Sequence, residues 1–145
     1  MTATRDHVTF RVGQQWVGLP VETVQEVLVA QRLAPVPLAP RAVAGFLNLR
    51  GQIVTAVDLR TGLAVEGRAP GADDAVFDVV VRDDDELFAL LVDEVGDVLP
   101  LADADVGPPP TTLRDPWRSA CAGAVRRDAD VLLVLDLPRL LRIDL

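Results

Sequence analysis

The chain repeats a part of its own sequence, and this repeat limits the possible folds more than any single motif does. The stretch VAGFLNLRGQIVTAVDLRTGL (43–63) aligns without a gap with CAGAVRRDADVLLVLDLPRLL (121–141), and VETVQEVL (21–28) aligns with VDEVGDVL (92–99). Any two hairpins of valine and leucine can align this well by chance. Both halves, however, keep the same order: a hairpin, an acidic-hydrophobic segment, a Pro-rich connection, a Gly-led hairpin, and "DL" opening a short helix. We therefore predict two similar lobes.

Short runs rich in β-branched and aromatic residues recur along the chain, and each is bounded by turn-forming residues, as strands are. Helical periodicity is scarce, and the eleven prolines cluster between the runs. Small sheets need closure to hide their strand edges. The sequence predicts an all-β fold of two similar five-stranded, closed or nearly closed sheets with short helices, its strands including 8–12, 16–20, 45–49, 52–57, 76–81, 86–92 and 131–135.

The domain organisation follows from the repeat and from the length. At 145 residues, half of them hydrophobic, the chain is long enough for one domain with a sizeable core. We predict a single domain over 1–145 made of two intertwined lobes, about 15–65 and about 76–145, joined by the loop 66–74. An exchange of the chain ends between the lobes stays open.

Charge and cysteine content restrict the partners and the compartment. The net charge of −8 argues against nucleic acid and anionic membrane surfaces, because both would repel it, and leaves protein partners or small ligands. No apolar run reaches the roughly 18 residues that span a bilayer, and the start has no signal sequence. The single cysteine, Cys121, cannot form an intramolecular disulfide. We expect a cytoplasmic protein without membrane insertion.

Several features resemble catalytic or metal sites but do not meet their requirements. The four consecutive acids 83–86 lack the spaced ligands and the glycine of a calcium loop. His7 lies near an N-terminus that we expect to fray, and there is no Gly-rich phosphate loop. Asp93 and Glu94 belong to the repeated segment. A pair that recurs in both lobes is expected to be a surface feature of each lobe rather than the acid–base pair of one active site. Trp117 is read as a core or lobe-edge residue, or as the cover of a groove. We predict no catalytic residues, no metal and no cofactor.

An arginine interrupts the apolar stretch GFLNLRGQIV (45–54). Asn48 to Gly51 reads as a hairpin turn, because asparagine and glycine tolerate the positive φ of tight turns. The equivalent turn in the second half is polar and lacks glycine, which indicates that the first turn is specialised. The alternative is that the turn arginine is simply solvated. An arginine on a rigid apolar platform suits a protein interface. We predict that Glu26 pairs with Arg50, orienting it while adding only about 0–1 kcal/mol to stability.

The chain resembles the CheW-like family of chemotaxis coupling proteins over essentially its whole length. The resemblance is carried by VETVQEVL, the spaced prolines, the NLRG turn with its following strand and "DLR", LFALLVDEVGDVL (87–99) and VLLVLDLPRLL (131–141). It implies two SH3-like five-stranded β-barrels packed together and no catalytic activity. It also implies that the chain links the regulatory domain of a CheA-type histidine kinase to the cytoplasmic tip of a methyl-accepting chemoreceptor. The receptor helix would lie in a groove between the lobes, and one barrel end would dock with the kinase.

The resemblance also implies which residues bind partners and where the protein works. It places the chain in receptor arrays at the inner face of the membrane, and the absence of receiver and ATP-binding motifs favours a stand-alone adaptor. Thr55 departs from the family, which commonly has proline there, but threonine suits a strand. A small-ligand or metal-binding regulatory module of the same fold is the alternative function. The protein-binding residues implied are Val24, Glu26, Gly45, Asn48, Arg50, Gly51 and Val98.

Overall fold

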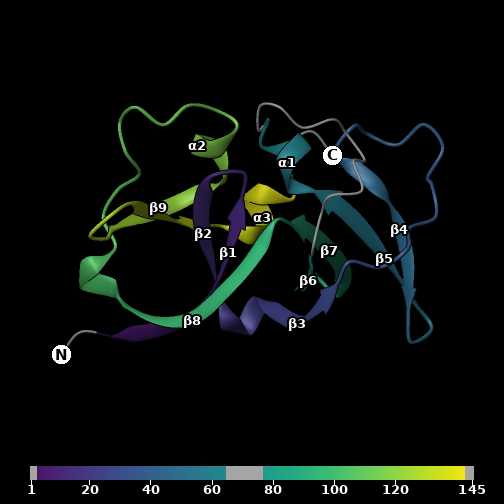
Figure 1. Ribbon diagram of the computed structural model, residues 1–145, viewed down its shortest axis with the longest axis horizontal. Helices are drawn as coiled ribbons and strands as arrows, with labels where there is room; N and C mark the ends of the chain where they lie inside the picture. The colour runs from purple at the N-terminus through teal and green to yellow at the C-terminus, as the bar shows by residue number, and fades with distance from the viewer. Residues whose placement is uncertain (1–2, 65–76, 143–145) are drawn as a thin grey trace.

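A computed structural model describes residues 3–64 and 77–142, and within them the chain forms two five-stranded sheets (Figure 1). The predicted joint 66–74 lies outside the described residues. The sheet of the β1 lobe has the order β8-β1-β2-β10-β9, formed by β1 (Thr4–Val12), β2 (Gln15–Pro20), β8 (Glu94–Ala102), β9 (Cys121–Arg126) and β10 (Val131–Leu135). The sheet of the β3 lobe has the order β3-β6-β7-β5-β4, formed by β3 (Val24–Val29), β4 (Val43–Leu49), β5 (Gln52–Asp58), β6 (Phe77–Asp83) and β7 (Glu86–Val92).

Helical structure in the described residues is confined to single turns. These are η1 (Val21–Thr23), α1 (Leu59–Gly62), η2 (Asp103–Asp105), α2 (Trp117–Ala120) and α3 (Leu137–Leu140). The predicted all-β class, with two five-stranded lobes and short helices, is confirmed.

The two lobes repeat each other down to individual residue pairs. The 71-residue offset between 21–28 and 92–99 also matches Phe10 with Val81 and Val17 with Phe88. Phe10 lies opposite Val17 in the β1 lobe, and Val81 lies opposite Phe88 in the β3 lobe. Each lobe also contains one parallel strand pair. In the β1 lobe, β10, the second strand of its Gly-led hairpin, runs parallel to β2; in the β3 lobe, the equivalent strand β5 runs parallel to β7. The sequence repeat is therefore a repeat of strand register.

The "DL" motif begins a helix in both halves, as predicted. The backbone N–H of Asp58 donates to the carbonyl oxygen of Ala42, and that of Asp136 donates to Ala120, both at 2.8 Å. Each aspartate side chain also accepts a hydrogen bond from a backbone N–H of the helix that it precedes. Aspartate satisfies N–H groups that the first helical turn leaves unpaired, so it fixes the start of α1 and α3.

The sheets divide the chain differently from the predicted lobes 15–65 and 76–145. Strand β2 pairs with β1 and β10, and β6 and β7 join β3 and β5. The three residues of η1 connect β2 in one lobe to β3 in the other. Each lobe thus combines the first two strands of one half with the last three strands of the other half. We call this arrangement the strand exchange.

Within residues 3–64 and 77–142, the buried apolar side chains form three clusters. The largest lies between the lobes and takes residues from both sheets, among them Phe10, Val17, Val81 and Leu90, none of which is exposed. Each lobe has a smaller cluster of its own, around Val54, Val80 and Ala89 in the β3 lobe and around Leu101, Leu132 and Val134 in the β1 lobe. Because the shared cluster is the largest, the two lobes form one packed unit.

One carboxylate, that of Asp78 on β6, is wholly buried in the β3 lobe. Its Oδ2 accepts a hydrogen bond of 3.1 Å from the backbone N–H of Gln31, and within the described residues its Oδ1 has no hydrogen-bond partner. Burial raises the pKa of Asp78, and the hydrogen bond from Gln31 offsets this only in part. The ionised form is therefore less favourable in the folded chain than in the unfolded chain.

Asp78→Asn is expected to flatten the pH dependence of stability. Because the pKa of Asp78 is higher in the folded state than in the unfolded state, folding takes up a proton between the two pKa values. The parent should gain stability as the pH falls from neutral through the raised pKa, until the ordinary aspartate value near 3.9 is reached. Urea unfolding between pH 7 and pH 4 measures this. The difference between variant and parent should change with pH in that window, and a constant difference would contradict the assignment.

Candidate protein-binding site

The turn between β4 and β5 consists of two residues, Arg50 and Gly51. Both have left-handed backbone conformations, with φ of 49° and 86°, and Leu49 and Gln52 face each other across the turn. Consecutive positive φ values match the tight hairpin turns that suit the twist of antiparallel strands. Asn48 was predicted to be part of the turn, but it lies within β4. Its side-chain Oδ1 accepts a hydrogen bond of 2.9 Å from the backbone N–H of Gly51.

The predicted ion pair between Glu26 and Arg50 is confirmed. Arg50 Nη2 donates to Glu26 Oε1, with the Arg50 side chain 67% exposed and that of Glu26 23% exposed. Glu26 lies on β3, and Arg50 follows β4; these are the two edge strands of the β3 lobe sheet. The pair therefore links the two edges and orients a guanidinium that remains open to a partner.

Gly45 serves backbone packing. A Cβ at this position would lie 2.5 Å from the carbonyl oxygen of Ala34, and the φ of 153° is unfavourable for a side chain. The close approach allows Ala34 and Phe46 to exchange two backbone hydrogen bonds of 2.8 Å. The aligned Gly123 makes the same kind of approach to Gly107 in the β1 lobe. Gly45 is buried and has no side chain to offer a partner, so its effect on binding would be indirect.

The two implied valines lie in different environments. Val24 is half-buried on β3 and packs against the cluster between the lobes. Val98 is 53% exposed on β8, an edge strand of the other lobe. Figure 1 shows β8 and β3 along the lower side of the molecule. The structure thus brings Glu26, Asn48, Arg50 and Gly51 together at one end of the β3 lobe and places Val98 apart from them.

One exposed apolar residue beside the turn was missed by the sequence reasoning, which treated Ile53 and Val54 alike. Ile53 is 62% exposed and lies opposite Asn48, whereas Val54 is wholly buried. Successive side chains of a strand point to opposite faces, so strand alternation could have separated the two. Ile53 adds apolar surface next to the arginine turn.

A groove lies between the lobes, with a cavity of about 370 Å³. Trp117 lines it and also packs against the apolar cluster between the lobes, so the core and the groove interpretations of this residue both hold in part. Arg118 fixes one wall by donating hydrogen bonds of 2.8–3.1 Å to three carbonyl oxygens of the 110–113 segment. The larger apolar side chains of the groove come from the residue that follows α1, the 110–117 segment and β10: Leu63, Leu113, Trp117, Val131 and Leu133.

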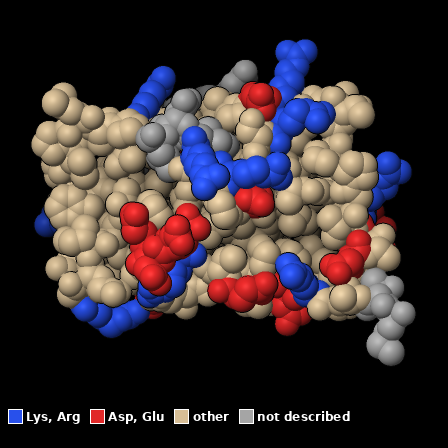
Figure 2. All heavy atoms as spheres, turned by 180° about the vertical axis from the view of Figure 1, so that it is seen from behind, with Lys and Arg blue, Asp and Glu red and all other residues tan. Residues whose placement is uncertain are grey.

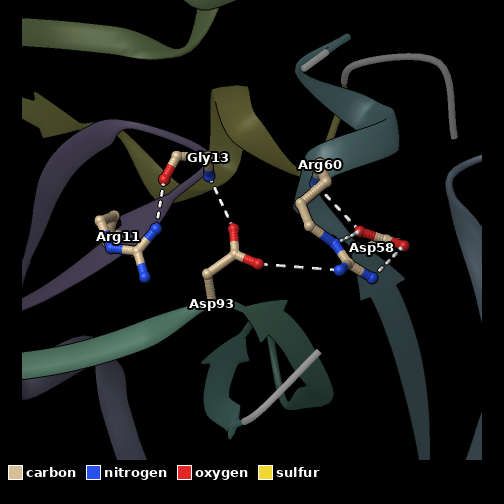
Figure 3. Close-up of polar contacts among 5 residues, drawn as sticks. All are labelled: Arg11, Gly13, Asp58, Arg60 and Asp93. Atoms are coloured by element: carbon tan, nitrogen blue, oxygen red, sulfur yellow. Dashed lines mark hydrogen bonds and ion pairs between the residues drawn. The ribbon is translucent and has the colours of Figure 1, made fainter. Parts of the chain in front are cut away.

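A buried ionic cluster connects the two lobes (Figure 3). Arg60 on α1 binds Asp58 through two contacts, Nε to Oδ1 at 3.0 Å and Nη2 to Oδ2 at 3.1 Å, and its Nη1 lies 3.7 Å from Asp93 Oδ1. Asp93 Oδ2 accepts a hydrogen bond of 2.7 Å from the backbone N–H of Gly13 in the β1–β2 turn. All three side chains are buried. Asp93 was expected on the surface, but it is buried and connects the two lobes.

The structure agrees with the sequence predictions for the acidic run 83–86 but not for His7. His7 is buried within β1 rather than frayed, and its Nδ1 donates to the carbonyl oxygen of Arg5 at 3.1 Å. Asp84 and Asp85, with φ of 51° and 67°, form the β6–β7 turn that the acidic run predicts. From behind, acidic and basic side chains are interspersed with broad uncharged areas (Figure 2).

In 3–64 and 77–142, no group of three His, Cys, Asp or Glu side chains is arranged to hold a metal ion. No helix in this part of the chain has the length and hydrophobicity needed to cross a membrane.

The fold places the chain among proteins built from two five-stranded β-barrel lobes that share a core. A family model, the CheW-like domain, matches residues 6–144, and the chain belongs to this family. The scaffolding protein TtCheW from Thermoanaerobacter tengcongensis has the same fold, with a TM-score of 0.83 over 98% of this chain and 95% of that one, at 24% identity. The predicted SH3-like fold and family are thereby confirmed.

Curated relatives agree with this assignment. The chemotaxis protein CheW of Rhizobium meliloti is 29% identical over 133 residues, which cover 92% of this chain and 84% of that protein. The chemotaxis protein CheW of Treponema pallidum is 27% identical over 135 residues, covering 92% of this chain and 79% of that protein.

Proposed function

We propose that the chain is a chemotaxis adaptor without catalytic activity. It couples the regulatory domain of a CheA-type histidine kinase to the cytoplasmic tip of methyl-accepting chemoreceptors, in arrays at the inner face of the membrane. Family membership supports the coupling role. The observation that carries the site is the Arg50 guanidinium, 67% exposed and yet fixed in direction by Glu26.

The kinase-binding face is the end of the β3 lobe around Arg50. Asn48 fixes the turn, Glu26 fixes the guanidinium, and Ile53 supplies exposed apolar surface beside it. A planar guanidinium that is already oriented loses less freedom when it binds. This combination of an oriented arginine and an apolar neighbour suits a partner that offers a carboxylate next to an apolar side chain.

The receptor-binding face is the groove between the lobes. Its apolar side chains, including Trp117 and Leu113, suit the apolar stripe of a helix. Arg118 and the shared core hold its walls in place without a partner. A helix bound there would contact both lobes.

Arg50→Ala is expected to weaken binding of the kinase regulatory domain at least tenfold, because oriented arginines are frequent interface hot spots. Calorimetric titration of the parent and the variant with the cognate regulatory domain measures this. The matched control is Arg126→Ala, which removes an exposed arginine from the equivalent hairpin of the β1 lobe and should leave binding unchanged.

Circular dichroism of both variants separates lost binding from lost folding. A double-mutant cycle with Glu26→Gln should show coupling in binding, since Glu26 acts through the orientation of Arg50. Equal affinities of parent and Arg50→Ala would remove this turn from the interface. If the parent does not bind but is thermally stabilised by a metabolite or divalent ion, the ligand-binding alternative would be favoured.

A further inference from the structure

The ionic cluster around Arg60 has an incomplete counterpart in the β1 lobe. Asp136 is the repeat equivalent of Asp58, but the position equivalent to Arg60 is occupied by Pro138. Asp58 is buried and binds its arginine through both oxygens. The side chain of Asp136 is 39% exposed, and its ion pair with Arg139 spans 3.8 Å, beyond hydrogen-bond distance. The β1 lobe thus keeps the carboxylate and lacks the arginine that fills the same place in the β3 lobe.

Pro138, the repeat equivalent of Arg60, lines a cavity of about 450 Å³. Asp136 and Pro138 form one side of it, and Pro20 and His7 form another. Pro20 lies opposite His7 in the β1–β2 ladder, just as Leu91 lies opposite Asp78 in the β3 lobe next to Asp58. The cavity therefore lies beside the repeat equivalents of Asp58, Asp78 and Leu91.

The chemistry of the lining suits a guanidinium. Because the carbonyl oxygen of Arg5 can only accept, His7 Nδ1 carries a proton, so Nε2 is the ring nitrogen that can act as an acceptor. Asp103 and Asp136 contribute two carboxylates, against one lining cation, the exposed Arg5. A guanidinium offers five N–H donors and no acceptor. The apolar remainder, Val106, Val134, Leu135 and Leu137, can contact the methylene stem of an arginine.

We propose that this cavity binds an arginine side chain of a protein partner. The surroundings indicate a protein surface, because Val98 and Val21 are 53% and 40% exposed beside it. Leu99, the neighbour of Val98, lies opposite His7, and Val21 follows Pro20. The partner's arginine would pair with Asp136, as Arg60 pairs with Asp58 within the chain. This site goes beyond the coupling role and does not depend on it.

The test is an NMR titration of the ¹⁵N-labelled full chain with N-acetyl-L-arginine amide. We expect saturable shifts at Ala122, Asp136 and Leu137, with a Kd of roughly millimolar order for so small a probe, and none at Gly51. N-acetyl-L-citrulline amide, which has the same shape without the charge, should bind at least tenfold more weakly. Equal binding of the two probes would overturn the proposal.

Variants at the cavity make the test specific. Pro138→Arg places an arginine where the repeat has Arg60, so it should abolish the saturable shifts, while Pro138→Ala should keep them. Asp136→Asn should weaken the probe at least tenfold, with ¹⁵N spectra showing that each variant is folded. Unchanged binding by Pro138→Arg would overturn the site. Tenfold tighter binding of free arginine than of the blocked probe would overturn the assignment to a protein partner.

Discussion

Replacing Arg60 with alanine is expected to lower the free energy of unfolding by about 3–5 kcal/mol, the usual loss when one member of a buried ion pair is removed. The substitution leaves Asp58 and Asp93 buried without the guanidinium that contacts both. It also weakens the polar connection from α1 to Gly13 in the other lobe. Urea unfolding of parent and variant at pH 7 measures the difference.

The control for Arg60→Ala is Arg50→Ala, which removes an arginine whose side chain is 67% exposed. An exposed pair contributes about 0–1 kcal/mol, so the two arginines should differ severalfold in their effect on stability. A loss below 1 kcal/mol for Arg60→Ala would mean that the buried cluster does not stabilise the fold.

Gly45→Ala is expected to cost about 2–3 kcal/mol, in the range of an overpacked site. The new methyl group would meet the carbonyl oxygen of Ala34 at 2.5 Å, so the backbone must move. Gly62→Ala is the matched control, because its Cβ would lie at an ordinary 3.6 Å from Ala42 Cβ. In α1 that change should be neutral or stabilising by up to about 1 kcal/mol. Urea unfolding distinguishes the two.

The same variant separates packing from recognition at Gly45. Folded Gly45→Ala protein should bind the kinase regulatory domain with the affinity of the parent, because Gly45 is buried and presents no side chain. A tenfold weaker Kd in protein that is fully folded by circular dichroism would return Gly45 to the interface that the family resemblance implies.

The sequence predicted the repeat of the two lobes and the helix starts well, because aligned positions carry both. Aligned positions such as Phe10 and Val81 have the same cross-strand neighbours, and Asp58 and Asp136 begin equivalent helices. Alternation of apolar residues and the capping preference of aspartate are local signals, so one sequence is enough to read them.

The strand exchange could not be read in this way. When two hairpins are similar, each can make nearly the same contacts with its own half of the chain as with the other half. The hydrophobic pattern therefore does not distinguish pairing within a half from exchange between the halves. The burial of His7 and Asp93 was missed for a related reason. Polar residues are expected to be exposed. They are buried only where partners distant in the sequence pair with them, as Arg60 does with Asp93.

The candidate site was predictable where it rests on a motif. The Glu26–Arg50 pair followed from an arginine in an apolar turn and an acid in the aligned segment. The exposure of Ile53 and the distance between Val98 and the turn depend on how strands are placed in three dimensions. Neither was evident from composition or spacing.

Because of the strand exchange, neither half of the chain contains a complete sheet. Residues 1–58 would supply only two of the five strands of the β1 lobe and three of the β3 lobe, and residues 77–145 would supply the rest. Separated halves would have to recombine, as fragments that complement each other do, before either lobe could form. The lobes are therefore not interchangeable modules: in evolution, a substitution in a core strand of one half has to be accommodated by strands encoded in the other.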